Sequence, residues 1–193
     1  MDLTALARER LGHLPLAVLE HCQRVSATAR TLARRFGVDE ERAALAGLLH
    51  DVARAFSAQE LLAAAVRYDL PVDPVAEQVP VLLHGPVGAA WVRQTLGMTD
   101  EEVLAAITWH STGHAGMSAL EKVVLLADKL EPEKGEHTTG LEQVAAAVQH
   151  DLDAALLAYF DWQIRHLLDR GALLHPATVL ARNALLEERR AAR

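Results

Sequence analysis

The sequence predicts an all-α protein, and three observations carry this prediction. Aliphatic residues recur every three or four positions along most of the 193-residue chain, which is the period of an amphipathic helix. No stretch shows the sustained alternation of β-branched residues that is typical of a half-buried strand. Aromatic residues make up only 4% of the chain, so we expect an aliphatic core packed between helices.

The first two elements are defined by an apolar stripe and by their end residues. Apolar positions from Leu16 to Phe36 step by three or four, and Gly37 is suited to end that helix as a C-cap residue. Asp39 is expected to cap a second helix that runs to Val52. Because this segment is apolar on nearly all sides, it is expected to be a buried central helix.

Capping residues, prolines and glycines delimit the later elements. Ser57 predicts the start of a third helix that ends near Tyr68, and the three prolines between 71 and 80 predict a loop or a set of short turns. Glycines at 113 and 116 precede a capping box formed by Ser118 and Glu121. Further helices are expected over residues 83–96, 100–110, 118–128, 142–170 and 176–190, and Pro132 is expected to close the one that carries Asp128.

The chain shows no internal repeat, low-complexity tract or linker. We therefore expect one domain over residues 1–193, with a core at about 16–170 and a C-terminal helix at 176–190. The helices should form a single bundle.

Charge and cysteine content restrict the partners and the compartment. The net charge of −7, from 19 Lys+Arg and 26 Asp+Glu, argues against nucleic acid and anionic membranes as partners. The single cysteine, Cys22, excludes an intrachain disulfide and a cysteine-based zinc site, and it is interpreted as a small core residue. Without a signal peptide or a membrane-length apolar run, a cytoplasmic location is expected.

Six histidine and aspartate residues stand out because they lie on or beside apolar helical stripes. An unpaired imidazole or carboxylate is costly to bury there, and the bundle interior is the common meeting place of the five helices involved. Imidazole and carboxylate together suit Fe, Mn, Zn or Co, and the mixture favours an octahedral, redox-capable or Mn-like ion over a closed structural zinc. The six are His21, His50, Asp51, His84, His110 and Asp128.

Purely structural interpretations compete with this one. A histidine followed by an aspartate can simply end a helix, where the macrodipole favours the imidazole. Asp128 could form a buried salt bridge with Arg24 or Arg54. Other histidines are interpreted as ordinary core or surface residues: His13, His137, His150, His166 and His175.

The sequence around the six residues resembles a known family. The order H…HD…H…H…D is similar to that of HD-domain metal-dependent phosphohydrolases. The amino-acid sequence around these residues resembles the YqeK family, the symmetrical bis(5'-nucleosyl)-tetraphosphatases of bacteria, over residues 16–170. The segments concerned are EHCQRV at 20–25, AGLLHDVA at 46–53, HGPVGA at 84–89, ITWHSTGHAGMS at 107–118 and EKVVLLADKLEP at 121–132.

The resemblance implies an all-helical HD fold and hydrolysis of diadenosine tetraphosphate to two ADP at an iron-containing site, with Mn or Co as substitutes. It implies two ions, with Asp51 able to bridge them. His21, His50, Asp51 and Asp128 match the primary ligands, and His84 and His110 match the pair that holds the second ion.

Asp51, Arg24 and Arg54 are the expected catalytic residues. We expect a metal-bound hydroxide to attack an inner phosphorus while the two arginines hold the polyphosphate, although each arginine could equally be a surface charge. Arg54 stands where such sequences often have lysine. The arginine keeps the positive charge, but it has a planar guanidinium group in place of the compact ammonium group.

Further substrate contacts are expected from two loops. Ser111, Thr112 and Gly113 could present hydroxyl and N–H groups to a phosphate or ribose, while a simple turn is the slightly preferred interpretation. Lys134 stands near the place where an arginine is expected behind Pro132, and it is the candidate replacement.

Two alternative functions remain open from the sequence. An HD phosphohydrolase could act on another nucleotide, as a 5'-nucleotidase or a deoxynucleoside triphosphate hydrolase. A nucleotide-binding regulator could instead use its metal for order without turnover, but such a site would not need His84 and His110. A homodimer is compatible with the sequence.

Overall fold

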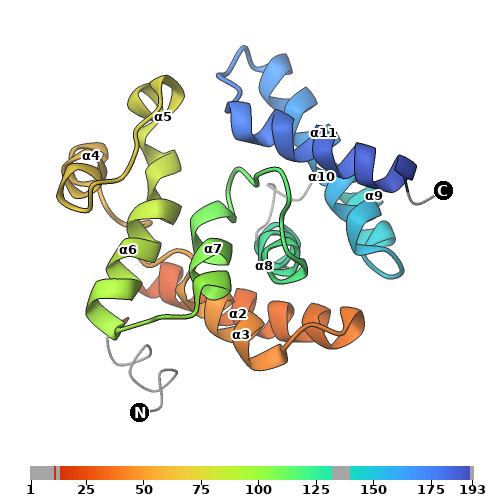
Figure 1. Cartoon of the computed structure of the whole chain (residues 1–193), viewed down its shortest axis with the longest axis horizontal. Helices are drawn as coiled ribbons and strands as arrows, with labels where there is room; N and C mark the ends of the chain where they lie inside the picture. The colour runs from red at the N-terminus through yellow and green to blue at the C-terminus, as the bar shows by residue number, and fades with distance from the viewer. Residues whose placement is uncertain (1–10, 12–13, 132–139, 192–193) are drawn as a thin grey trace.

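The computed structural model describes residue 11 and residues 14–131 and 140–191, and all regular secondary structure in these ranges is helical (Figure 1). This confirms the predicted fold class. The helices are α2 (Leu16–Phe36), α3 (Glu40–Leu49), α4 (Ala58–Arg67), α5 (Pro74–Gln78), the 3-10 helix η1 (Pro80–Leu83), α6 (His84–Leu96), α7 (Glu101–Trp109), α8 (Ala119–Lys129), α9 (Glu142–Ala147), α10 (Leu152–Asp169) and α11 (Pro176–Ala191).

Most helices begin and end where the capping residues predict. Gly37 ends α2 in the left-handed conformation at φ 69°. The Asp39 side chain accepts a hydrogen bond from the Arg42 backbone N–H at 2.9 Å, which caps α3. Both predicted caps built on Ser57 and Ser118 are complete capping boxes.

The structure differs from the sequence predictions in three places. The second helix stops at Leu49 rather than Val52, because residues 50–55 form turns closed by bonds such as Arg54 N–H to the Asp51 carbonyl at 2.9 Å. The proline-rich segment contains the five-residue helix α5, capped by Asp73. The predicted helix over 142–170 is divided into α9 and α10, because the Asp151 carboxylate caps a new helix by accepting from the Ala154 N–H at 2.8 Å. Pro132 lies outside the described residues.

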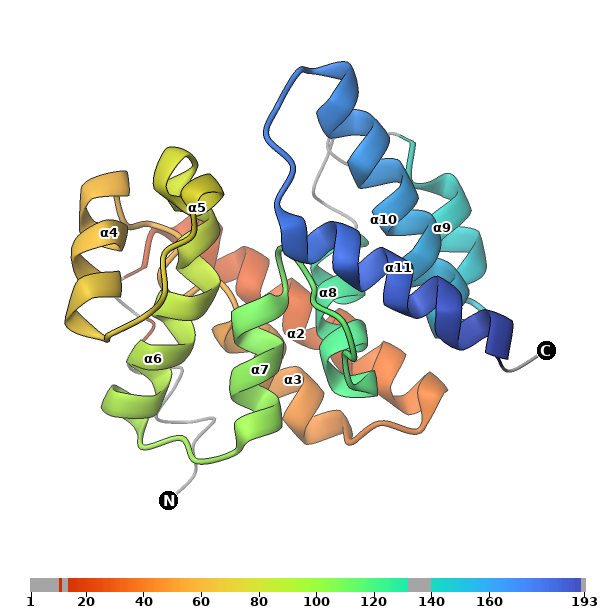
Figure 2. The same cartoon turned by 45° about the horizontal axis from the view of Figure 1, so that its top comes forward.

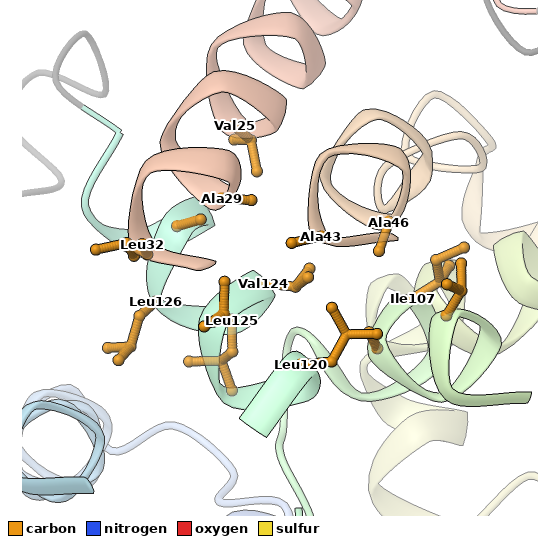
Figure 3. Packing of buried hydrophobic residues seen from close by; sticks show 14 of the residues in the cluster. Val25, Ala29, Leu32, Ala43, Ala46, Ile107, Leu120, Val124, Leu125 and Leu126 are labelled. Atoms are coloured by element: carbon orange, nitrogen blue, oxygen red, sulfur yellow. The ribbon is translucent and has the colours of Figure 1, made fainter. Parts of the chain in front are cut away.

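Helices α2, α3, α7 and α8 form the centre of the molecule. Helix α2 packs on α3 and α8, and α7 packs on α3, α6 and α8 (Figure 2). Small side chains such as Ala29, Ala43 and Ala46 face larger ones such as Leu120 and Val124 in this core (Figure 3). The aliphatic, alanine-rich composition therefore allows the central helices to approach closely.

Two groups of helices flank this centre on opposite sides (Figures 1 and 2). Helices α4, α5 and α6 lie on one side, where α4 and α6 share a smaller core that includes Leu61, Ala65 and Val87. Helices α9, α10 and α11 lie on the other, and α10 packs on α8. None of the described helices combines the length and the apolar character needed to cross a membrane.

Candidate metal centre

Five of the six histidine and aspartate residues singled out in the sequence line one cavity of about 730 Å³. The sixth, His50, does not line it, but its Nε2 lies 3.6 Å from the carboxylates of Asp51 and Asp128, which do. They come from helix ends and from the first half of α2, so five separate elements converge here. All are buried except His21, which is partly buried. The structure therefore brings together His21, His50, Asp51, His84, His110 and Asp128.

Three of the histidines are oriented by backbone carbonyls one helical turn earlier. The Nδ1 of His50 donates to the Gly47 carbonyl at 2.7 Å, and the Nδ1 of His110 donates to the Ile107 carbonyl at 2.8 Å. His84 makes the same bond to the carbonyl of Val81. Since the proton lies on Nδ1, each Nε2 keeps its lone pair for a ligand in the cavity.

Asp51 lies between the histidines of the cluster. Its Oδ1 lies 3.0 Å from the His84 Nε2 and 3.5 Å from the His110 Nε2, and those two nitrogens are 2.9 Å apart. Its Oδ2 lies 3.6 Å from the His50 Nε2 and 3.8 Å from the His21 Nε2. One carboxylate thus faces two pairs of imidazoles.

Asp128 completes the pair formed by His21 and His50. Its Oδ1 lies 3.1 Å from the His21 Nε2 and 3.6 Å from the His50 Nε2. Its Oδ2 accepts a hydrogen bond from the Lys129 ammonium at 2.6 Å. Asp128 therefore presents one oxygen to the cluster while Lys129 holds the other.

The donor set fits a metal ion. The ligand atoms form three overlapping groups, in each of which all atoms lie within 4.8 Å: His21, His50 and Asp51; His50, His110 and Asp128; Asp51, His84 and His110. Two donors bound to one ion at about 2.1 Å, at a right angle, lie about 3 Å apart. Among the described residues the buried His50 Nε2 has no hydrogen-bond partner, and a bound ion would supply one.

A glycine allows the close approach of the two histidines that face Asp51 Oδ1. A Cβ atom at Gly85 would lie 2.5 Å from the Thr108 carbonyl oxygen and 3.0 Å from that of Ile107. Only a residue without a side chain lets the start of α6 lie against the end of α7. That contact brings His84, the neighbour of Gly85, to His110.

The electrostatics of the cluster favour the ligand forms of most of these groups. Burial lowers the pKa of His110 to about 4, so its imidazole is neutral at pH 7. Although burial alone would raise it, the facing histidines, His50 foremost, hold the pKa of Asp51 well below its usual range. Burial lowers the pKa of His50, but Asp51 and Asp128 outweigh it and raise that pKa above 6.5.

His110 makes the stability of the metal-free protein depend on pH. Between its usual pKa of 6.5 and its native value of about 4, the unfolded chain binds a proton that the native chain does not. The free energy of unfolding should therefore fall as pH falls through this window. His50, whose pKa is raised, contributes its own change only above 6.5.

Urea unfolding of chelator-treated protein at pH 4 to 7 measures this effect. The His110→Asn variant lacks the titrating group and should show a flatter dependence. Equal slopes for the two proteins would contradict the assignment to His110.

The predicted substrate residues divide into two groups. Arg24, Arg54 and Ser111 line the cavity, with Arg54 exposed and the Ser111 Oγ 3.2 Å from the His110 Nε2. Thr112 and Gly113 do not line it. The Thr112 carbonyl accepts from the Thr178 hydroxyl at 2.9 Å, and a Cβ at Gly113, which has φ 64°, would lie 2.6 Å from the Phe160 ring. Lys134 lies outside the described residues.

Two further charged residues of the cavity were missed in the sequence. Lys129 and Glu131 line it together with Asp128. Glu131 pairs with Arg24 at 2.7 Å, and Lys129 forms a salt bridge with Asp128 at 2.6 Å. The sequence offered one indication of Glu131, which is its spacing. It follows Asp128 by three residues, just as Arg24 follows His21, so each pair lies about one helical turn apart.

Comparison with known proteins identifies the family of this fold. The HD-domain family model matches residues 18–133, which include all six residues of the cluster. A solved structure from Clostridium acetobutylicum, described as a "predicted HD superfamily hydrolase involved in NAD metabolism", superposes with a TM-score of 0.90 at 31% identity, covering 97% of this chain and 98% of that one. The fold and the site thus define an HD-domain protein.

Curated relatives narrow the family further. The symmetrical bis(5'-nucleosyl)-tetraphosphatase of Halalkalibacterium halodurans is 35% identical over 92% of this chain and 94% of its own. That of Bacillus subtilis is 34% identical over 86% and 88%. The chain belongs to this family of HD-domain proteins.

Proposed function

We propose that the protein is a metal-dependent phosphohydrolase that cleaves diadenosine tetraphosphate symmetrically into two ADP molecules. The observation that carries the proposal is a largely buried cluster of six metal-type ligands, five of which line a cavity whose wall also holds cationic side chains. The activity named for the homologous enzymes supplies the substrate class.

The ligands suggest two neighbouring ion positions that share Asp51. In this proposal His21, His50, Asp51 and Asp128 hold one ion, and Asp51, His84 and His110 hold the other. Iron is the proposed ion, with Mn or Co as substitutes. When bound, such ions supply a water of lowered pKa and neutralise charge on the phosphoryl group.

The chain's own residues bind and orient the polyphosphate. In this proposal Arg24, one turn beyond His21, and the exposed Arg54 contact phosphate oxygens, which is supported by the presence of both residues in the cavity wall. Lys129 adds a third cation, and the Ser111 hydroxyl a neutral donor beside the two histidines. Thr112 and Gly113 have no part in this proposal because their contacts are with α11 and Phe160.

Product analysis tests the position of cleavage. Chromatography after incubation with diadenosine tetraphosphate should give ADP alone, because attack next to the central linkage releases two equal halves. A chelator should abolish the reaction, since the nucleophile and the charge neutralisation are both lost. Equimolar ATP and AMP would contradict symmetrical cleavage, and faster turnover of mononucleotides in a substrate panel would contradict the proposed substrate.

A further inference from the structure

Glu131 is a buried carboxylate that contacts two functional side chains at once. Only 1% of its side chain is exposed. Its Oε2 lies 3.2 Å from the His21 Nδ1, and its Oε1 accepts a hydrogen bond from the Arg24 Nε at 2.7 Å. A carboxylate buried to this degree is stable only with such partners.

For His21, Glu131 takes the place of the backbone carbonyl that accepts from Nδ1 in the other three histidines. The other three histidines of the cluster stand at helix ends and donate from Nδ1 to carbonyls three residues earlier. His21 stands inside α2, where those carbonyls already accept helical hydrogen bonds. Since a carboxylate can only accept, Glu131 fixes the His21 proton on Nδ1 and turns Nε2 toward Asp128.

The contact with Arg24 uses the other oxygen of the same carboxylate. The Arg24 side chain lines the cavity and follows His21 by one turn of α2. Holding the Nε–H restricts the orientation of the guanidinium, whose two Nη atoms carry its other four N–H donors. A guanidinium group that is already held in one orientation loses less conformational entropy when it binds a phosphate.

We propose that Glu131 is a positioning residue that couples metal binding to nucleotide binding, by orienting His21 toward the metal position and Arg24 toward the phosphates. The proposal deepens the proposed function and rests on it for the identity of the nucleotide. Removing the carboxylate should therefore weaken two affinities that a residue with a purely structural role would leave unchanged.

Calorimetry on chelator-treated protein measures both affinities in the Glu131→Gln variant. We expect binding of Mn²⁺, used as the probe metal, to weaken about 10- to 100-fold. Binding of ADP at saturating Mn²⁺ should weaken about tenfold, the effect of one charge-assisted hydrogen bond.

Glu121 offers a matched control for the loss of a buried carboxylate. It is 4% exposed and pairs with the His114 Nε2 at 2.6 Å, but it does not line the cavity. The Glu121→Gln variant should lose stability while keeping both affinities. If Glu131→Gln behaved in the same way, the proposal would be wrong.

The Arg24→Ala variant separates the two halves of the proposal. It should weaken ADP binding alone, and adding Glu131→Gln to it should weaken Mn²⁺ binding without a further loss for ADP. If the losses of ADP affinity from the two substitutions added up in the double variant, Glu131 would not act through Arg24. The same conclusion would follow if the wild-type protein did not bind ADP.

A shorter carboxylate covers the case in which the glutamine variant does not fold. Glu131→Asp keeps the charge but cannot span both partners, so both affinities should again fall, and unchanged values would overturn the proposal. If the wild-type protein cleaved no dinucleotide, the proposed function would fail while the Mn²⁺ and ADP measurements still tested Glu131.

Discussion

Replacing Asp51 with asparagine should abolish metal binding and turnover while the helical content is retained. The amide keeps the volume of the carboxylate but removes the charge that faces four imidazoles in the cluster. Turnover should fall by at least about three orders of magnitude, beyond the loss from removing a single electrostatic stabiliser. Metal analysis of protein purified without chelator, circular dichroism and an ADP-release assay measure the three quantities.

Asp73 provides the control for this substitution. It also pairs with a histidine, since its Oδ2 lies 2.8 Å from the His175 Nε2, but it lies outside the cavity. Asparagine caps helices about as well as aspartate, so Asp73→Asn should keep metal content and turnover. An active Asp51→Asn variant with its metal bound would show that the ligand assignment is wrong.

Replacing His84 with alanine should remove one of the two proposed ions and most of the turnover. His84 contacts Asp51 Oδ1 and His110, and within the described part of the chain it makes no polar contact with His21, His50 or Asp128. The ion position proposed for those three residues and Asp51 should therefore stay filled. We expect about one ion per chain and a rate reduced about 100-fold or more.

The His175→Ala variant is the matched control, because His175 is also a carboxylate-bound histidine but lies outside the cavity. It should keep both the metal content and the rate of the wild-type protein. Two ions per chain in the His84→Ala variant would contradict the division into two positions.

The sequence predicted the helices well where the signal was local. A cap such as Asp39 or Ser118 bonds to a backbone group within three residues, so its effect does not depend on the rest of the fold. The prediction failed over 142–170 because Leu141 to Phe160 keeps an apolar helical pattern across the turn at 148–151. Only the cap at Asp151, which also binds Arg189 of α11, marks the break.

The sequence by itself determined which residues could bind a metal, because buried imidazoles and carboxylates on apolar helices require partners whatever the topology. The tertiary structure decided how they are held. Glu131 reaches His21 across 110 positions of sequence, and Thr178 binds the Thr112 carbonyl across 66. Such contacts depend on the relative placement of packed helices, which no local pattern encodes. For that reason the metal-type ligands could be found from the sequence, whereas the contact of Glu131 with His21 and the structural roles of Thr112 and Gly113 could not.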